Sequence, residues 1–387
     1  MIYRILCIVV LVLILVRPIA IIYEHKDKFF QPGYAKQYES LKTAYYSSQY
    51  VKEENASLMP DESFESFVGG AFLRGTNPIL IVHEHPPLGR YIIALSILLF
   101  DNASTLIPVL LAIALVGIFL IGKMVLGKTL FALLPLVIFA NEPLFLGKLY
   151  YSPLLEPIQL PFIIFSLYFF IKGVKSKESY AWFILASLMV GFVISIRFFI
   201  LGAALFAAMI AYLFLRRAFD KNFYTFIFSM PLSLVVLLAS YTKTIQDGYS
   251  MWQIFSVQKY IFYYHQSKLE NLFSFWDLIL FNRWHTWWAD RRIITDAQWI
   301  FLWPISIFLS FFSIPFAIFR KIPISEEKKI ISIWVVAYSV LLSIGNTTTR
   351  YFLPLLPFLY ILSIGFILDI VKLIHVEYKK DKSSSKK

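Results

Sequence analysis

Long apolar runs alternate with short polar segments along most of this chain. A hydrocarbon core of about 30 Å needs about 20 mostly apolar residues to be crossed as a helix. We therefore predict an all-α polytopic membrane protein with about 10 transmembrane helices. The predicted spans are residues 5–22, 104–122, 129–147, 158–171, 180–196, 198–215, 223–241, 299–319, 330–345 and 351–371.

Residues 91–100, YIIALSILLF, are apolar but too few to cross the core as a helix. Placing this segment at the membrane interface puts every short basic loop on one face of the bilayer. The loops lie at 123–128, 172–177, 216–221 and 320–329, and the tail KKDKSSSKK (379–387) ends on the same face. Lys and Arg are enriched in cytoplasmic loops, so we predict that this face is cytoplasmic.

The polar segments predict one membrane domain at 1–371, with an outer loop at 24–103 and a large outer loop at 242–298. A basic cytoplasmic tail follows at 372–387. The first span follows Arg4 and has no small-residue cleavage site, so we interpret it as a retained signal anchor and not as a signal peptide. The sequence contains no internal repeat and no soluble second domain.

Two apolar runs contain an interruption. Asn141-Glu142-Pro143 lies near the end of the third span, and proline kinks or ends a helix. Arg197 interrupts the run 180–215, which we therefore predict to be a helical hairpin with Arg197 near its outer end.

The composition agrees with a membrane protein. The 387 residues are 59% hydrophobic and 16% charged, whereas soluble domains are about 25% charged. The net charge of +12 resembles that of nucleic-acid-binding proteins, but the basic residues stand between apolar runs and orient helices in a bilayer. Cys7 is the single cysteine, which excludes an intrachain disulfide.

The densest polar stretch runs from Pro60 to Tyr91 and begins with Asp61 and Glu62, with Glu65 one helical turn later. An amphipathic run follows and would hold these acids at the membrane surface. As catalytic groups, the two acids suit a reaction that deprotonates a hydroxyl. The alternative is a structural one, because acids are also favoured in the first turn of a helix.

His85 and Arg90 close this stretch, in the segment HEHPPLGR at 83–90. Pro86 and Pro87 fix an extended backbone and present both side chains rigidly. A protonated His and an Arg donate charge-assisted hydrogen bonds to a lipid phosphate. The alternative is an entry turn into an interfacial helix, with Arg90 snorkelling to the headgroups.

Glu156, Arg197 and Arg350 lie at the outer ends of predicted spans. Glu156 belongs to a predicted outer connection at 148–161 and is a functional candidate, because an ionisable group at the membrane edge is costly to keep unpaired. Its alternative role is to pair with Lys148. Arg197 and Arg350 are either ligands of a lipid phosphate or interfacial anchors.

The second outer loop carries an aromatic segment at 251–293 that contains His265. Its Trp and Tyr residues form either an interfacial belt or a surface that stacks on a sugar. His265 and His285 lack the spacing of a metal site, and the chain has no Walker loop and no dinucleotide-binding glycine pattern. The parity of the spans places the candidates on the extracytoplasmic side: Asp61, Glu62, His85, Glu156, Arg197, His265 and Arg350.

Together these residues resemble the GT-C superfamily of polytopic glycosyltransferases. The pattern is most similar to dolichyl-phosphate-mannose protein O-mannosyltransferases and more distantly to lipid A aminoarabinose transferase. Asp61-Glu62 matches the family's Asp-Glu pair, and 83–90 matches its His-Pro-Pro-Leu-Gly-Lys/Arg segment. The stretch at 139–170 resembles the segment with the second outer-loop acid, which is Glu156 here instead of the usual Asp. GFVISIRFF (191–199), the region 257–284 and 350–362 resemble later family segments.

The resemblance implies transfer of a sugar, most plausibly mannose, from a polyprenyl- or dolichyl-phosphate carrier to a hydroxyl of protein Ser or Thr, with inversion. It implies Asp61 as general base, with Glu62 and Glu156 as positioning acids. It further implies that His85, Arg90, Arg197, His265 and Arg350 contact the lipid phosphate or the sugar. The family does not require a metal, although two outer carboxylates leave a divalent metal open.

Three alternatives stay open from the sequence. The acceptor is a glycolipid or a cell-envelope glycan, or the protein transports a lipid-linked sugar, or it is a scaffold without activity. Transport predicts charges in the middle of spans and inverted repeats, whereas the charges here gather at the outer ends. The membrane is a prokaryotic plasma membrane or, in a eukaryote, the endoplasmic reticulum.

Overall fold

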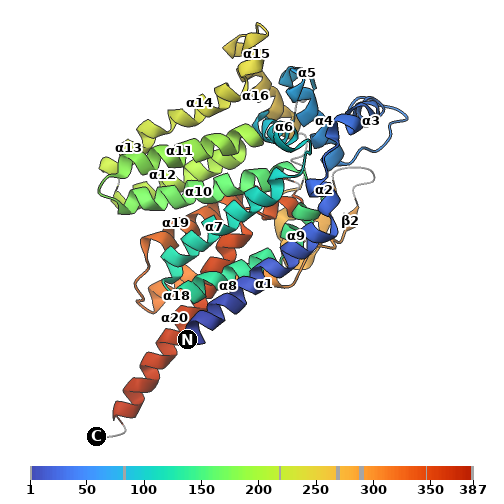
Figure 1. Ribbon diagram of the computed structural model, residues 1–387. Coiled ribbons are helices and arrows are strands. Elements are labelled where there is room, and N and C mark those ends of the chain that lie inside the picture. The colour runs from blue at the N-terminus through green and yellow to red at the C-terminus, as the bar shows by residue number, and fades with distance from the viewer. Residues whose placement is uncertain are drawn as a thin grey trace.

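The computed structural model describes residues 2–81, 84–217, 219–266, 271–286, 292–345 and 347–384. Most of these residues are helical, and the helices form one bundle from which the C-terminal end of the last helix projects (Figure 1). Within the described residues, the strands are β1 (Trp284–His285) and β2 (Ile293–Ile294), which pair antiparallel. The predicted all-α class is confirmed.

Among the described residues, eight helices are long and apolar enough to cross a membrane. One of the eight consists of two consecutive helices, α13 (Lys221–Ser229) and α14 (Pro231–Ser240). The other seven are α1 (Ile2–Glu24), α7 (Leu106–Leu126), α10 (Leu155–Lys175), α11 (Ser179–Ile196), α12 (Ile200–Arg217), α18 (Leu302–Phe319) and α20 (Leu356–Ser384).

A bent helix pair provides a ninth span if its two halves are counted together. α8 (Thr129–Ala140) and α9 (Pro143–Tyr150) meet at an angle of 59°. Pro143 is the first residue of α9. Proline is tolerated at this position because an amide hydrogen there would have no acceptor within the helix. The interruption at Asn141-Glu142-Pro143 is therefore a real break in the helix.

Two predicted spans differ from the structure. The span expected at 330–345 is α19 (Glu326–Leu342), which has 17 residues and begins with four charged residues, so its apolar part runs only from Ile330 to Leu342. The span expected at 351–371 begins only at Leu356, after the 3₁₀-helix η1 (Thr349–Phe352). The structure thus has eight or nine candidate spans among its described residues where about ten were expected.

The first predicted outer loop is an ordered set of short helices. Its last helix, α6 (Leu88–Phe100), is only 13 residues long and packs on α4 (Asp61–Leu73). The helices are α2 (Lys26–Phe30), α3 (Tyr34–Tyr46), α4 (Asp61–Leu73), α5 (Pro78–Ile81) and α6 (Leu88–Phe100).

The second outer loop also contains helices, which lie beside the first loop at one end of the bundle (Figure 1). Residues 267–270 and 287–291 of this aromatic segment lie outside the described residues. The helices are α15 (Thr242–Gln246), α16 (Met251–Gln266) and α17 (Ser274–Phe281).

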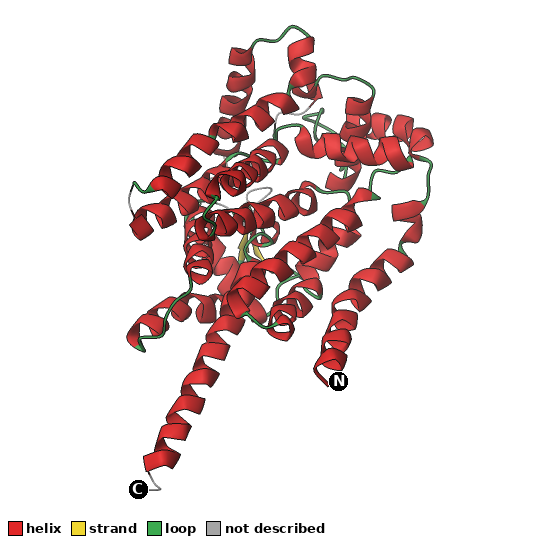
Figure 2. Cartoon of the chain, turned by 60° about the vertical axis from the view of Figure 1, so that its left-hand side comes forward, coloured by secondary structure: helices red, strands yellow, loops and turns green. Residues whose placement is uncertain are grey.

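The centre of the bundle is α10, which packs between α7 and α11 and is the most buried of the candidate spans. Its first turn therefore lies at a fixed place, at the end of the bundle where the two large loops lie. At the other extreme of the chain, α20 continues to Ser384, so the predicted tail at 372–387 begins as a continuation of the last helix (Figure 2).

Candidate active site

A cavity of about 200 Å³, at the end of the bundle where the two large loops lie, brings together side chains from six separate segments. Five of the predicted site residues line it: Asp61, His85, Glu156, Arg197 and Arg350. The sequence distance between Asp61 and Arg350 is 289 residues, and their side chains are in direct contact. Tyr50, Glu65 and Glu84 complete the polar lining.

Asp61 is the first residue of α4 and follows Pro60 at the helix N-cap. The N-terminal end of a helix favours a negative charge, so the carboxylate is stabilised where it stands. Its Oδ1 accepts a hydrogen bond from the Tyr50 hydroxyl at 3.0 Å, and its Oδ2 accepts one from Arg350 Nη1 at 2.8 Å. The side chain is 52% exposed, which leaves it accessible to a substrate.

Glu156 is the buried anion of the site. Its Oε1 lies 2.9 Å from Arg197 Nη1 and 3.7 Å from Arg350 Nε, and its Oε2 lies 3.7 Å from Lys148 Nζ. Three cations thus contact one carboxylate, and Arg350 also pairs with Asp61. Glu156 lies in the first turn of α10, not in a connecting loop as predicted, because Pro157 is tolerated in a first helical turn.

Arg197 occupies the break between α11 and α12, where its backbone is extended. Its guanidinium lies 5.2 Å from the ring centre of Tyr351, and that of Arg350 lies 5.6 Å from the same ring. An aromatic face attracts a cation, so Tyr351 helps to hold both arginines in one place.

His85 and His265 form an aromatic stack at the edge of the cavity. Their ring centres are 5.3 Å apart, and His265 stacks in turn on Phe198 at 4.6 Å. Nδ1 of His85 is buried and has no hydrogen-bond partner among the described residues. Burial, reinforced by Arg197 and other nearby cations, lowers the pKa of His85 well below its ordinary value. This shift favours a neutral imidazole over the protonated one expected from the sequence.

Arg90 does not face the cavity. Its side chain is fully buried, with Nε 2.8 Å from Oε2 of Glu65 and Nη2 3.0 Å from Oε1. This paired geometry occupies the guanidinium, so Arg90 anchors α4 through Glu65. The expected contact of Arg90 with a phosphate does not fit this structure. Sequence reasoning had Glu65 one turn after Asp61 but did not identify Arg90 as its partner.

Glu62 also lies apart from Asp61. It lines a separate cavity of about 560 Å³ together with Lys28 and Asp101. Successive residues of an α-helix point about 100° apart, so two adjacent acids at a helix start face different spaces. The sequence pair Asp61-Glu62 is not a single pair of carboxylates in space.

Two tyrosines of the site were not predicted: Tyr50 lines the cavity, and Tyr351 lies against Arg197 and Arg350. Tyr50 belongs to no motif, Tyr351 entered only as part of the segment 350–362, and a tyrosine in a chain with 23 tyrosines carries little local signal. Among the described residues, no group of three or more His, Cys, Asp or Glu side chains is placed to hold a metal ion.

Part of the chain matches a known family model. Residues 84–243 match the model for dolichyl-phosphate-mannose-protein mannosyltransferase. This segment contains His85, Arg90, Glu156 and Arg197, whereas Asp61 precedes it and Arg350 follows it. A comparison with curated proteins found no match.

The whole fold matches solved structures of membrane glycosyltransferases. The oligosaccharyltransferase AglB from Archaeoglobus fulgidus, solved with an inhibitory peptide and a dolichol-phosphate, has a TM-score of 0.54 at 11% identity. ArnT from Cupriavidus metallidurans, bound to undecaprenyl phosphate, has a TM-score of 0.50 at 16% identity. The chain has the GT-C fold.

The GT-C likeness extends over 90% of this chain for AglB and 86% for ArnT, which confirms the fold implied by the sequence pattern. The chain spans 52% of the solved AglB chain and 59% of the solved ArnT chain. With identities this low, the comparison establishes the architecture, and the activity of this chain is argued below from its own residues.

Proposed function

We propose that this chain is an integral membrane glycosyltransferase that moves a sugar from a polyprenyl-phosphate carrier to a hydroxyl acceptor. The observation that carries the proposal is the convergence of Asp61 with Arg197 and Arg350 in one cavity. Such a site offers a base for a hydroxyl and cations for a leaving phosphate. The family matched by residues 84–243 and the lipid phosphates bound by AglB and ArnT support it.

In the proposed reaction, Asp61 accepts the proton of the acceptor hydroxyl. The oxygen attacks the anomeric carbon, and the bond between that carbon and the phosphate oxygen breaks. A single displacement inverts the anomeric carbon and releases polyprenyl phosphate as an anion. The exposure of Asp61 fits the role of base, because the acceptor must reach it.

The departing phosphate would bind Arg197 and Arg350. Charge-assisted hydrogen bonds from arginine to phosphate are strong and geometrically specific. Glu156 would hold both guanidiniums in position, since it touches each of them. His85, as a neutral imidazole with a free Nδ1 in the described structure, would add a hydrogen bond to the phosphate or the sugar.

Several finer parts of the proposal rest on the family resemblance. The sugar is mannose, the acceptor is Ser or Thr of a protein, and Glu62 helps to position that acceptor. His265, stacked on Phe198, would contact the sugar or phosphate. The cavity lies on the extracytoplasmic side, because the short basic loops between spans favour the cytoplasm.

The first test is sugar transfer in reconstituted membranes with radiolabelled polyprenyl-phosphate-mannose. Wild type is compared with Asp61→Asn, and the products are separated into protein and lipid fractions. Label on protein with wild type alone supports the reaction, the acceptor and the base together. Label in the lipid fraction keeps the reaction and changes the acceptor to a glycolipid. Transfer that persists in EDTA is expected, since the proposal uses no metal.

Two outcomes would overturn the proposal. Movement of intact donor across the bilayer without transfer would favour a transporter. Equal transfer by wild type and Asp61→Asn would remove Asp61 from the chemistry.

A further inference from the structure

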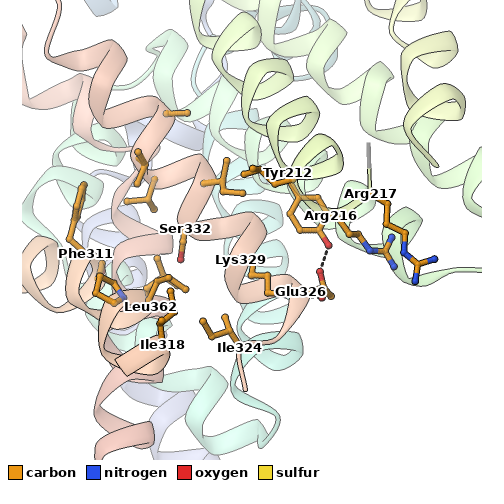
Figure 3. Close-up of a pocket in the computed structure, with 18 residues that line it drawn as sticks. Tyr212, Arg216, Arg217, Phe311, Ile318, Ile324, Glu326, Lys329, Ser332 and Leu362 are labelled. Atoms are coloured by element: carbon orange, nitrogen blue, oxygen red, sulfur yellow. Dashed lines mark hydrogen bonds and ion pairs between the residues drawn. The ribbon is translucent and has the colours of Figure 1, made fainter. Parts of the chain in front are cut away.

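A second cavity lies at the opposite end of the bundle from the candidate active site. It has a volume of about 960 Å³ and opens between α12, α18 and α19 (Figure 3). Arg197 immediately precedes the start of α12 and Arg217 ends it, and these 18 helical residues span about 27 Å. This distance is close to the thickness of the hydrocarbon core, so the two cavities belong to different leaflets. We call the second cavity the inner cleft.

The walls of the inner cleft are mainly apolar. Apolar side chains of three helices line it: Phe311 and Ile318 of α18, Ile333 and Ala337 of α19, and Leu362 of α20. Phe311 and Ile318 are exposed on the surface of the bundle, where a membrane protein meets acyl chains. A volume at the upper end of the range for ligand pockets, with walls of this kind, fits hydrocarbon chains.

The rim of the inner cleft is basic. Arg216 and Arg217 are exposed at the end of α12, and neither guanidinium has a hydrogen bond or ion pair within the described residues. The nearby acid, Glu326, is already held by the Tyr212 hydroxyl and by Lys329 at 3.1 Å. Figure 3 shows the two arginines on the far side of the Tyr212–Glu326 hydrogen bond from Phe311, Ile318 and Leu362.

The cleft also contains an unpartnered polar atom. Oγ of Ser332 is buried and has no hydrogen-bond partner among the described residues. Ser332 lies one helical turn from Lys329, so it stands between the basic rim and the apolar wall. An orphaned hydroxyl at that depth suits the ester groups of a glycerolipid, which lie between a phosphate and its acyl chains.

We propose that the inner cleft binds one anionic phospholipid of the cytoplasmic leaflet. The phosphate lies on Arg216 and Arg217, and the acyl chains lie against α18 and α19. Arginine is suited to such a contact because its planar group donates two parallel hydrogen bonds to phosphate oxygens. The leaflet follows from the orientation proposed above, whereas the binding is independent of the glycosyltransferase activity.

The experiment is native mass spectrometry of the full chain in detergent, with phosphatidylglycerol or phosphatidylcholine added. Wild type is expected to retain one phosphatidylglycerol and to retain phosphatidylcholine much less. Replacing both arginines in Arg216→Gln/Arg217→Gln should weaken phosphatidylglycerol binding about 30-fold, which corresponds to about 1 kcal/mol for each cation near an anionic headgroup.

A charge-matched control uses Lys177→Gln/Lys221→Gln. Both lysines are exposed on the same predicted face, and neither lines the cleft. The control is expected to bind phosphatidylglycerol as wild type does. An equal loss in the control would overturn the proposal, because it would show a general effect of net charge.

A second variant tests the apolar wall. Ala337→Phe fills the cleft and leaves the basic rim unchanged, so it should also weaken phosphatidylglycerol binding. Gel filtration and a melting curve establish that each variant is folded. Equal retention of both phospholipids by wild type would overturn the anionic preference. Displacement of phosphatidylglycerol by undecaprenyl phosphate would assign the cleft to the sugar carrier instead.

Discussion

Arg350 joins the two carboxylates of the candidate active site. Its Nη1 donates to Asp61 at 2.8 Å, and its Nε lies 3.7 Å from Glu156. A guanidinium presents donors on two edges of a rigid plane, so one side chain reaches both acids. Arg350 therefore orients the proposed base and supplies charge for the proposed phosphate.

Arg350→Gln is expected to lower kcat by about 100- to 1000-fold, the usual cost of removing one group that stabilises a developing anion. Arg350→Lys keeps the charge and loses the planar fork, so its rate should lie between those of wild type and Arg350→Gln. Initial rates of sugar transfer at saturating donor measure both. Lys42→Gln removes an exposed cation of the outer loop and serves as the control. An unchanged kcat in Arg350→Gln would contradict this role.

His85 is held where a charge is unfavourable, which gives stability a dependence on pH. Burial and nearby cations lower the pKa of His85 in the folded protein, whereas an unfolded histidine titrates near pH 6.5. Between these pKa values the folded state binds fewer protons than the unfolded state. The stability is therefore fully present above about pH 6.5 and is lost as the pH falls toward the folded pKa.

Wild type should lose about 1.4 kcal/mol of unfolding free energy between pH 7.5 and 5.5 that His85→Asn does not lose. Denaturant titrations of both proteins in the same detergent, at the two pH values, measure the difference. Parallel pH dependence in the two proteins would mean that His85 is protonated in the folded state or does not titrate differently on unfolding.

At the scale of elements, Gly89 allows three helices to meet beside the site. A Cβ at this position would lie 2.7 Å from Leu155 Cδ2 and 2.9 Å from Ile196 Cγ2. Leu155 precedes Glu156, and Ile196 precedes Arg197. The start of α6 thus packs directly against the two segments that carry the buried Glu156–Arg197 ion pair.

Gly89→Ala is expected to destabilise the protein by about 1–3 kcal/mol, the usual effect of overpacking, and to lower the transfer rate by displacing Glu156 and Arg197. Gly365→Ala is the matched control, since its Cβ would meet only Leu126 at an ordinary 3.4 Å. That change should be neutral or stabilising, because alanine favours a helix interior. Melting curves and transfer rates of the two variants test the prediction, and equal behaviour would refute it.

The elements show where local sequence signals succeed. The break at Arg197 follows from one charge in an apolar run, and the break at Pro143 follows from the missing amide of proline. The start of α10 was placed too late, because Pro157 resembles a helix breaker although it lies in a first turn. The place where an apolar run begins is thus a less exact guide to the start of a helix than the residues that cap the helix.

At the scale of the whole molecule, α6 decides the topology. It has 13 residues, which is too short to cross a bilayer. With α8 and α9 counted together as one span, three crossings separate the first outer loop from the connection after α10. If α6 crossed as well, these two regions would lie on the same side.

Single-cysteine labelling tests this arrangement. In a Cys7→Ser background, Asn55→Cys in the outer loop and Lys177→Cys after α10 are both exposed positions. An impermeant maleimide added to intact cells is expected to label the first and not the second. Labelling of both from outside would contradict this arrangement: either α6 crosses the membrane, or α8 and α9 form a re-entrant pair instead of a span.

The sequence by itself determined what depends on neighbouring residues: the membrane class, most spans, the helix breaks and the candidate residues around the site. These properties follow from the local balance of apolar and charged groups, which needs no knowledge of distant parts of the chain. Only the tertiary structure decided which charges meet. In the folded chain Asp61 pairs with Arg350, Arg90 is buried against Glu65, and Glu62 lines another cavity. Such pairings depend on the packing and rotation of helices far apart in sequence, and a hydrophobic pattern does not specify them.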